Sequence, residues 1–305
     1  MRPSNPLRHE ALAYAGAGEF GPSCAAAAQA ALDAGRRVLV LATEDRLESV
    51  RVDLGDLAEQ ATLVPTDEHG RNPSRITALL DGFSRAPQEQ RSLALTDWGV
   101  PGRSRAASAE TQLAESLLNL VSFDAWPLDV LCLYDTSRLD GAGLADMRRV
   151  HPSVRGHEAN PEYQPDLFDA LFAGSLLAAP MEIDVDPVGP AQLAETRALV
   201  RLYAEGCALA PERVQDLVVA ANEIVTNSIR HGGGSARVAL WEQEDAVVCQ
   251  VADAGRITDP LAGRLAPPAS AGSGRGLWRA NQLCDLVQIR SSAAGTVVRL
   301  FVERS

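Results

Sequence analysis

Apolar positions in the first half of the chain form short, nearly continuous runs separated by amphipathic stretches. Such runs are typical of strands buried on both faces of a parallel sheet, and they read "RRVLVLAT", "ATLVP", "RSLALTDW" and "LDVLCLYD". The stretches around them have helical spacing and read "SCAAAAQAALDAG", which closes on Gly35, "NPSRITALLDGF", "SAETQLAESLLNLV" and "LDGAGLADMRRV". Because strands and helices alternate, residues 1–160 are predicted to form an α/β domain with a mostly parallel sheet.

The pattern changes after a connector. Residues 161–180 are predicted to link two domains and contain one short apolar helix within "DLFDALFAGSLL". From there "MEIDVD" alternates like an entering strand, followed by predicted helices at 191–208, 211–231 and 275–284 and predicted strands at 235–242, 246–253, 286–292 and 295–303. Helices followed by paired strands predict an α+β sandwich over residues 181–305, with helices on one face of a mixed sheet.

Composition narrows the classes of function. The chain has 305 residues, enough for about two domains, with 46% hydrophobic and 22% charged residues. Its net charge of −12 disfavours a surface for nucleic acid or an anionic membrane, because binding phosphates requires a concentrated basic patch. No stretch approaches the roughly 20 apolar residues of a membrane span, and the N-terminus lacks the apolar core of a signal peptide. We therefore expect a cytoplasmic protein.

Lysine is absent, since all 28 basic residues are arginine. Neither a phosphate-binding loop of the G-x-x-x-x-G-K-[ST] kind nor Schiff-base catalysis can form without lysine. A nucleotide bound by this protein therefore needs a scheme that dispenses with that residue.

Cysteine and histidine positions predict no metal site. The five cysteines are scattered and form no C-x-x-C pair, so they are expected to pack as small core residues. His151 and His157 are close enough in sequence to share a metal, but no acidic or cysteine partner lies at ligand spacing. A metal shared by this pair is therefore set aside.

The carboxyl ends of strands commonly carry functional groups in α/β folds. Here they carry the pairs Thr43-Glu44, Asp97-Trp98 and Tyr134-Asp135. Each pair suits a helix start or a turn as well as it suits a ligand contact. The residues at these strand ends therefore do not indicate the function of the first half of the chain.

Motifs in the first half resemble the MEDS sensory domain, an α/β module of bacterial signalling proteins. The stretches "LRHEALAY", "NPSRI", "ESLLNL", "LCLYDTSRLD" and "VHPSV" occur in the family's order over about residues 7–156. The resemblance implies a domain that senses a small molecule rather than one that catalyses a reaction. The family often has a Gly-Glu-Pro segment before its tryptophan, where this chain reads "LALTDWGVPGR", so no ligand residue is carried over.

The predicted helix at 211–231 has an apolar stripe and a polar face. The stripe recurs at helical spacing and consists of Val214, Leu217, Val218, Ala221, Ile224 and Val225. At about 100° per residue, Glu223 and Asn227 fall on the opposite face, together with Asp216 and Arg230. An isolated polar pair on such a face is usually just solvated, so a functional reading depends on other elements.

Two further elements supply that context. The apolar strand "VVCQVADAG" ends at Asp253 beside Gly255, where a carboxylate can accept a hydrogen bond from an exocyclic amine. "AGSGRGLWRANQLCDLV" then places Gly272, Gly274 and Gly276 before a helix, whose N-terminus favours an anion. A Pro/Ala/Ser-rich loop rather than a strand precedes this G-x-G-x-G pattern, so a dinucleotide-binding Rossmann fold is rejected.

In this order the three elements resemble the N, G1 and G2 boxes of the GHKL ATPases, whose fold is the Bergerat type. The nearest likeness is to anti-sigma-factor serine/threonine kinases, over about residues 181–303. The resemblance implies ATP and Mg²⁺ as cofactors, with Glu223 as the catalytic base and Asn227 as the metal ligand. It implies an adenine site made of Asp253, Gly255 and Thr296, and a phosphate cover made of Gly274, Arg275 and Gly276.

Two positions depart from the family's pattern. Ile257 stands where the G1 box has its second glycine, and Gly272 stands where well-behaved kinases carry an arginine before the G2 glycines. Arg275 replaces that arginine only if its side chain turns toward the phosphates. The departures bear on phosphotransfer more than on nucleotide binding.

The predicted function is that of an ATP-binding anti-sigma regulatory protein with a sensory domain. Its expected partners are a sigma factor, which it sequesters, and an anti-anti-sigma protein of STAS type, which it phosphorylates on serine or threonine. A sensor histidine kinase is the alternative, but His9 lies about a domain away from the ATPase elements and the connector is too short for a helix hairpin. A catalytically inert, nucleotide-gated docking module and a homodimer also stay open.

Overall fold

The structure, a computed structural model, describes residues 6–67, 72–85, 91–98, 104–122, 124–155, 159–267 and 274–304. The chain divides into two compact units, Met1–Phe168 and Asp169–Ser305. The division falls inside the predicted linker and within the short helix α6 (Leu167–Ala173). None of the helices in the described ranges is long and apolar enough to cross a membrane.

The first unit is built on a six-stranded sheet of order β3-β2-β4-β5-β1-β6, in which all neighbouring strands run parallel. Its strands are β1 (Arg8–Tyr14), β2 (Val38–Ala42), β3 (Ala61–Pro65), β4 (Ser92–Asp97), β5 (Leu128–Asp135) and β6 (Ser153–Val154). The predicted parallel α/β fold is confirmed. β1 is not marked by a continuous apolar run, because buried residues alternate along it with polar or partly exposed ones.

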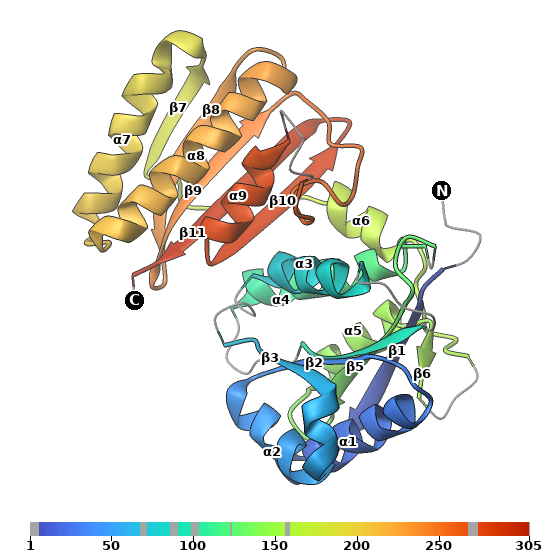
Figure 1. The fold of residues 1–305 in the computed structure, drawn as a ribbon. Coiled ribbons are helices and arrows are strands. Elements are labelled where there is room, and N and C mark those ends of the chain that lie inside the picture. Colours follow the sequence, from blue (N-terminus) through green and yellow to red (C-terminus); the bar gives the residue numbers. More distant parts are fainter. Residues whose placement is uncertain are drawn as a thin grey trace. The chain divides into compact units, whose positions relative to one another are not determined.

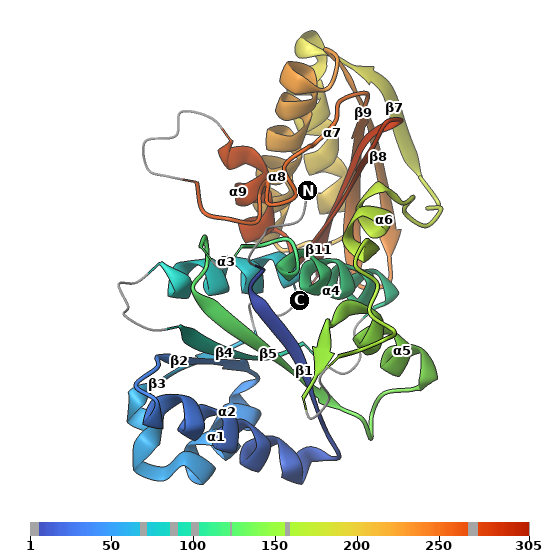
Figure 2. The same ribbon diagram turned by 90° about the vertical axis from the view of Figure 1, so that its right-hand side faces the viewer.

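Helices cover both faces of this sheet (Figures 1 and 2). α1 and α2 lie on one face, and α3, α4 and α5 lie on the other. Their bounds are α1 (Ala17–Asp33), α2 (Glu44–Leu54), α3 (Pro73–Ser84), α4 (Arg105–Leu118) and α5 (Gly141–Val150), with a 3₁₀ turn at Gly55–Gln60. The strand order explains this split. The chain runs toward the β3 edge through α1 and α2 and back through α3, α4 and α5, and right-handed crossovers in opposite directions place helices on opposite faces.

Local sequence signals start and end several of these helices. Asn72 caps α3 by accepting a hydrogen bond from the N–H of Ser74 at 3.1 Å, and Asp140 caps α5 through the N–H of Gly143 at 2.8 Å. Gly35, just beyond α1, has a φ of 72°, which only glycine adopts without strain. α1 begins earlier than its predicted start at Ser23 and contains Pro22 in its N-terminal part.

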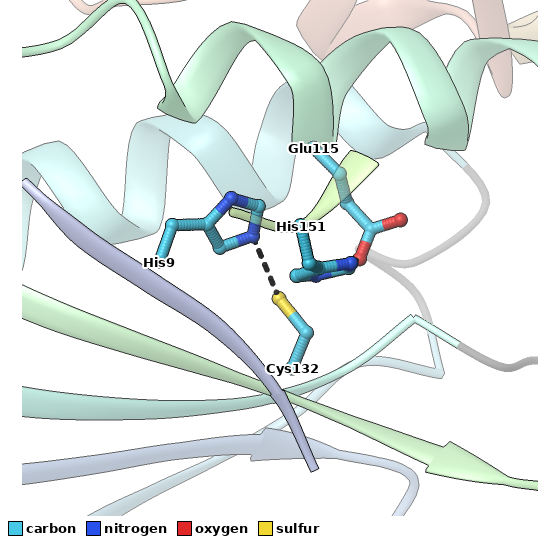
Figure 3. A group of neighbouring side chains, drawn as sticks. All are labelled: His9, Glu115, Cys132 and His151. Carbon is cyan, nitrogen blue, oxygen red and sulfur yellow. Dashed lines mark hydrogen bonds and ion pairs between the residues drawn. The ribbon is translucent and has the colours of Figure 1, made fainter. Parts of the chain in front are cut away.

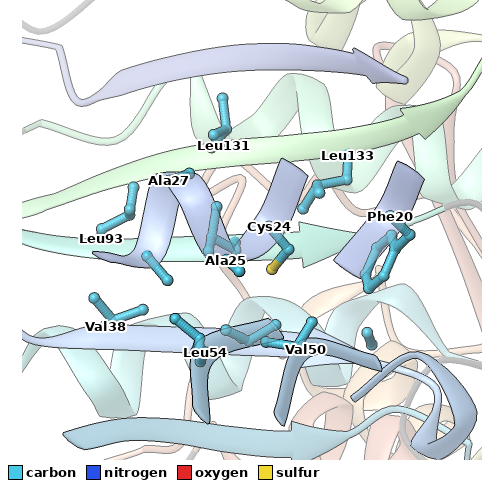
Figure 4. Close-up of a cluster of buried hydrophobic side chains, with 14 of the residues drawn as sticks. Phe20, Cys24, Ala25, Ala27, Val38, Val50, Leu54, Leu93, Leu131 and Leu133 are labelled. Carbon is cyan, nitrogen blue, oxygen red and sulfur yellow. The ribbon is translucent and has the colours of Figure 1, made fainter. Parts of the chain in front are cut away.

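The core between α1, α2 and the sheet is almost wholly apolar (Figure 4). Ala27 and Ala28 of α1 are buried there, so the helix packs closely on β4 and β5. Leu131 and Leu133 of β5 point to this face, and by strand alternation Cys132 points to the opposite face, toward α4 and α5.

The second unit has a five-stranded sheet of order β10-β11-β9-β8-β7. The strands are β7 (Ile183–Val188), β8 (Ala236–Gln243), β9 (Ala246–Asp253), β10 (Leu286–Ser292) and β11 (Gly295–Glu303). The predicted mixed sheet is wrong, because every neighbouring pair is antiparallel. β9 and β10 do run in the same direction across α9, but β11 lies between them and is antiparallel to both.

Three helices cover one face of this antiparallel sheet, as predicted (Figure 1). They are α7 (Leu193–Gly206), α8 (Pro211–His231) and α9 (Arg275–Leu283), and a 3₁₀ turn at Pro190–Gln192 precedes α7. The α+β class is confirmed. α8 begins and ends where the pattern predicts, and every residue of its predicted apolar stripe is buried. α8 therefore packs its apolar side on the sheet and turns its polar side elsewhere.

Candidate functional site

The polar side of α8 faces α9 rather than open solvent. A Cβ built on Gly276 would lie 2.7 Å from Asn227 Nδ2 and 3.1 Å from Glu223 Oε2, so no larger residue fits there without displacement. Both α8 side chains are half-buried as a result. The structure thus brings together Glu223, Asn227 and Gly276, which are predicted from separate motifs.

Glu223 has a basic partner that the sequence motifs do not single out. Arg279 of α9 donates a hydrogen bond of 2.7 Å to Glu223 Oε1, with the two side chains 50% and 27% exposed. Arg279 lies four residues after Arg275 and therefore on the same face of α9. That spacing is the sequence signal that could have identified it.

Asp253 is held at the end of β9 by two donors. Ser228 Oγ donates to its Oδ2 at 2.6 Å, and the N–H of Gly255 donates to its Oδ1 at 2.7 Å. A carboxylate offers about four acceptor positions, so Asp253 keeps capacity for a further donor. Ser228 is not predicted from the sequence, although it directly follows Asn227 on α8.

Gly232, the first of the three glycines after α8, allows a close approach to Asp253. A Cβ on Gly232 would lie 2.4 Å from the Asp253 carboxyl carbon and 2.6 Å from the carbonyl oxygen of Ser228. One on Gly255 would lie 2.7 Å from the Cα of Gly232. Gly232 and Gly255 therefore pack backbone against backbone, a packing that both positions permit only because they lack side chains.

Thr296 belongs to the same end of the sheet. It pairs with Asp253 across β9 and β11, and its Oγ1 donates to the carbonyl oxygen of Gly255 at 2.9 Å. Ser291 Oγ lies 2.8 Å from Thr296 Oγ1 and accepts from the N–H of Ile257 at 2.8 Å. Ile257, which replaces the expected glycine, is thus tied to the sheet by Ser291.

The N-terminus of α9 completes the arrangement. Gly274 caps the helix with a φ of 86°, a left-handed conformation suited to glycine. Arg275, the first residue of the helix, is exposed. Gly272, the other residue weighed in this loop, lies outside the described residues.

These groups, which lie on α8 and on the elements next to it, could recognise three kinds of chemical group. Asp253 can accept from an amine, and the first N–H groups of α9 can bind an anion. The carboxylate and amide oxygens of Glu223 and Asn227 are ligands suited to a hard divalent cation. An acceptor for an amine, helix N–H groups for an anion and oxygen ligands for a cation together fit a nucleotide with its metal.

The strand ends of the first unit mostly serve structure. Thr43 precedes α2 as its N-cap residue, Asp97 pairs with Arg46, and the Tyr134 hydroxyl donates to Glu115. A cavity of about 440 Å³ in this unit lies at the amino ends of β1, β4 and β5.

The turn from β1 into α1 reads "GAGEFGPS", with the glycine spacing of a phosphate-binding loop and proline in place of lysine. Carboxylates already accept from the N–H group of its first residue and from the one before it: Gly16 donates to Asp135 Oδ1 at 2.9 Å, and Ala15 donates to Glu19 Oε2 at 2.7 Å. Burial alone would raise the pKa of Asp135, but hydrogen bonds from Ser137 and Gly16 outweigh it and lower that pKa. A phosphate would meet negative charge here.

Family models match both units. Residues 187–302 match the histidine kinase-like ATPase domain. Residues 8–152 match MEDS, the methanogen/methylotroph DcmR sensory domain. The chain therefore carries a MEDS sensory domain followed by an ATPase domain of GHKL type, and both resemblances are confirmed. An ATPase domain of this kind implies ATP as its ligand.

Solved structures also show similarity. The chain is similar to the RsbU and RsbW domains of Rv1364c from Mycobacterium tuberculosis, with 22% identity and a TM-score of 0.32 over 40% of this chain and 32% of that one. It is similar to a chain of the SiaB–SiaC complex from Pseudomonas aeruginosa, with 15% identity and a TM-score of 0.33 over 40% of this chain and 89% of that one. This chain thus spans about a third of the first structure's length. A search of curated protein sequences finds no match.

Proposed function

We propose that this protein is an ATP-binding anti-sigma regulator that sequesters a sigma factor and phosphorylates an anti-anti-sigma protein on serine or threonine. The observation that carries the proposal is the meeting of Glu223, Asn227 and Gly276 between α8 and α9. The MEDS domain is the sensory half, and the ATPase domain is the effector half.

In this proposal each site residue has one task. Asp253 accepts a hydrogen bond from the adenine amine, while Ser228 and Gly255 hold its carboxylate in place. Thr296 closes the adenine pocket, and Gly274, Arg275 and Gly276 cover the phosphates. Asn227 holds Mg²⁺, and Glu223 accepts the proton of the attacking serine hydroxyl. Bound Mg²⁺-ATP supplies the transferable phosphoryl group.

The Arg279 ion pair sets a condition on catalysis. If Glu223 acts as a base through Oε1, it exchanges its hydrogen bond from Arg279 for one from the substrate hydroxyl. The pair is half open to solvent, and exposed pairs contribute only about 0–1 kcal/mol. That exchange is therefore cheap.

A sensor histidine kinase fits less well. Its phospho-accepting histidine must be exposed on a helix, whereas His9 is 2% exposed and lies on the strand β1. Between 159 and 182 the described chain forms one helix, α6, of 7 residues. A dimerising helix hairpin has no room there.

The proposal is tested by partner capture with and without nucleotide. The full chain, immobilised and incubated with purified candidate sigma factors and STAS-type proteins, should retain a sigma factor in the presence of Mg²⁺-ATP and transfer radiolabel from γ-labelled ATP to serine of the STAS protein. ATP-dependent capture without label would leave an inert docking module. If the chain neither binds ATP nor captures a partner, the proposal is refuted.

A further inference from the structure

Four side chains with metal-ligand chemistry meet inside the first unit (Figure 3). His9 comes from β1, Cys132 from β5, Glu115 from α4, and His151 from the residue after α5. All four are buried, and one ligand atom from each lies within 4.8 Å of the others. Figure 3 shows both rings, the thiol and the carboxylate turned toward a common point.

The strand register explains half of this meeting. Ala11 of β1 pairs with Cys132 of β5, and His9 lies two residues before Ala11 on the same face. His9 Nε2 is therefore a diagonal neighbour of Cys132 Sγ, at 3.2 Å. α4 and the end of α5 bring Glu115 and His151 up to the two sheet residues, as Figure 3 shows.

Both imidazoles present the same nitrogen to the cluster. His151 Nδ1 lies 2.7 Å from the carbonyl oxygen of Met147, an acceptor only, so Nδ1 carries the proton. His9 Nδ1 lies 3.0 Å from Asn119 Oδ1, and the Asn119 amide nitrogen donates to the Val150 carbonyl, which fixes Oδ1 as the acceptor. Each Nε2 is thus left with its lone pair, as in metal-binding histidines oriented by an outer oxygen.

One of these lone pairs accepts no hydrogen bond in the described structure. His151 Nε2 is buried and has no hydrogen-bond partner there, and it lies 3.7 Å from Glu115 Oε1. A buried acceptor without a donor has lost its hydration with nothing to replace it, which destabilises the fold. A cation between His151 and Glu115 would remove that cost.

The other two groups are also supported from outside. Thr96 Oγ1 lies 3.3 Å from Cys132 Sγ and can donate to a thiolate. The Tyr134 hydroxyl donates to the Glu115 carboxylate at 2.5 Å. Outer hydrogen bonds of this kind hold ligands in place and tune their basicity.

We propose that His9, Glu115, Cys132 and His151 bind one Zn²⁺ ion. Tetrahedral zinc with bonds of about 2.0–2.3 Å separates its ligand atoms by about 3.3–3.8 Å, so the set has to contract by only about 1–1.5 Å. Binding releases the thiol proton of Cys132 to solvent. Two neutral imidazoles, one thiolate and one carboxylate then balance the ion's charge, which suits a buried site.

Burial already favours neutral imidazoles. It lowers the pKa of His9 to about 4 and that of His151 well below its ordinary value. Burial, and then the charge of Glu115, raise the pKa of Cys132, so the thiol stays protonated until a cation arrives. Four protein ligands leave no open position, which marks a structural or sensing site rather than a catalytic one.

The cluster bears on two expectations from the sequence. Cys132 is buried as predicted, yet it lies in a polar cluster instead of packing as a simple core residue. The sequence offers His151 no acidic or cysteine partner at ligand spacing, whereas the structure places Glu115 and Cys132 beside it from other elements. His157, its proposed companion, lies outside the described residues.

The test is the metal content of the full chain, produced in medium supplemented with zinc or, as a spectroscopic probe, cobalt. We expect one ion per chain by mass spectrometry and, for cobalt, the near-ultraviolet charge-transfer absorption of a thiolate ligand. Cys132→Ser should remove that absorption, and Cys24→Ser, an equally buried cysteine on the opposite face of the sheet, should keep it. Asn119→Ala should weaken zinc binding by about 10–100-fold.

A metal-free chain without cobalt absorption would overturn the proposal and leave a buried hydrogen-bond network. So would cobalt absorption that persists in Cys132→Ser. If Cys132→Ser fails to fold, the unmodified chain still decides, because thiolate charge transfer with tetrahedral ligand-field bands supports the site and the lack of both refutes it.

Discussion

The two polar clusters of this protein lie on comparable scaffolds, each under helices on one face of a sheet, and differ in almost every other respect. The ATPase site is half-exposed, rich in glycine and aligned along α8. The cluster around His151 is fully buried, and its ligands come from four separate elements. A nucleotide has to enter its site from solvent, so that site stays partly exposed. A metal ion needs only several lone pairs that point to one place.

That difference explains why one cluster is visible in the sequence. Glu223, Asn227 and Ser228 fall within six consecutive residues, and Asp253 and Gly255 lie together at one strand end. His9 and Cys132 are 123 positions apart and become neighbours only through the pairing of β1 with β5. A motif of neighbouring residues can therefore predict the first cluster, but it cannot predict the second, whose members are far apart in the sequence.

The largest expected effect separates catalysis from binding in the ATPase site. Glu223→Ala should reduce phosphotransfer by about 10²–10⁴-fold, the usual worth of general-base assistance, while nucleotide and sigma-factor binding persist. Initial rates with γ-labelled ATP and a STAS-type substrate measure the effect.

Arg279→Ala is the matched control, because it breaks the same ion pair and keeps the carboxylate. Transfer that falls equally in both variants would assign the loss to the pair rather than to a base. Full transfer by Glu223→Ala would remove Glu223 from catalysis altogether.

A smaller effect tests the nucleotide contacts. Asp253→Asn and Asn227→Ala should each weaken Mg²⁺-ATP binding at least about tenfold, or 1.4 kcal/mol. The first replaces an acceptor by a donor beside the adenine amine and Ser228, and the second removes the metal ligand. Calorimetry measures both, with Asp259→Asn in the exposed loop after β9 as control. Unchanged affinity in both variants would contradict the assigned site.

The mildest test asks whether the clusters belong to independent domains. We expect limited proteolysis to cut first between about 157 and 190, giving a fragment of about 1–160 that binds no nucleotide and a fragment of about 181–305 that does. The first fragment has carboxylates where a phosphate loop would offer N–H groups. Initial cleavage inside either unit, or ATP retained by the N-terminal fragment, would argue against this division.

Much of the fold is predictable from local pattern. α8 begins at Pro211, a favoured first helical residue, and stops at glycines, so its bounds and its buried stripe follow from the sequence. β5 also has the predicted bounds, because it is a continuous apolar run. β1 is not predicted, because exposed and buried residues alternate along it. The antiparallel order of the second sheet is not predicted either, because it depends on the insertion of β11 between β9 and β10.

The sequence by itself determined the order of the two matched domains and the classes of fold, and it predicts the residues of the proposed nucleotide site, because each rests on periodicity or on spacing within one element. Only the tertiary structure decided what those residues touch. Arg279 reaches Glu223, and Gly232 admits Asp253, through packing between elements. The convergence of His9, Glu115, Cys132 and His151 has the same origin. Side-chain contacts depend on distances in space. Parallel strands are connected by long helical crossovers, so their pairing places side by side residues that are far apart in the sequence.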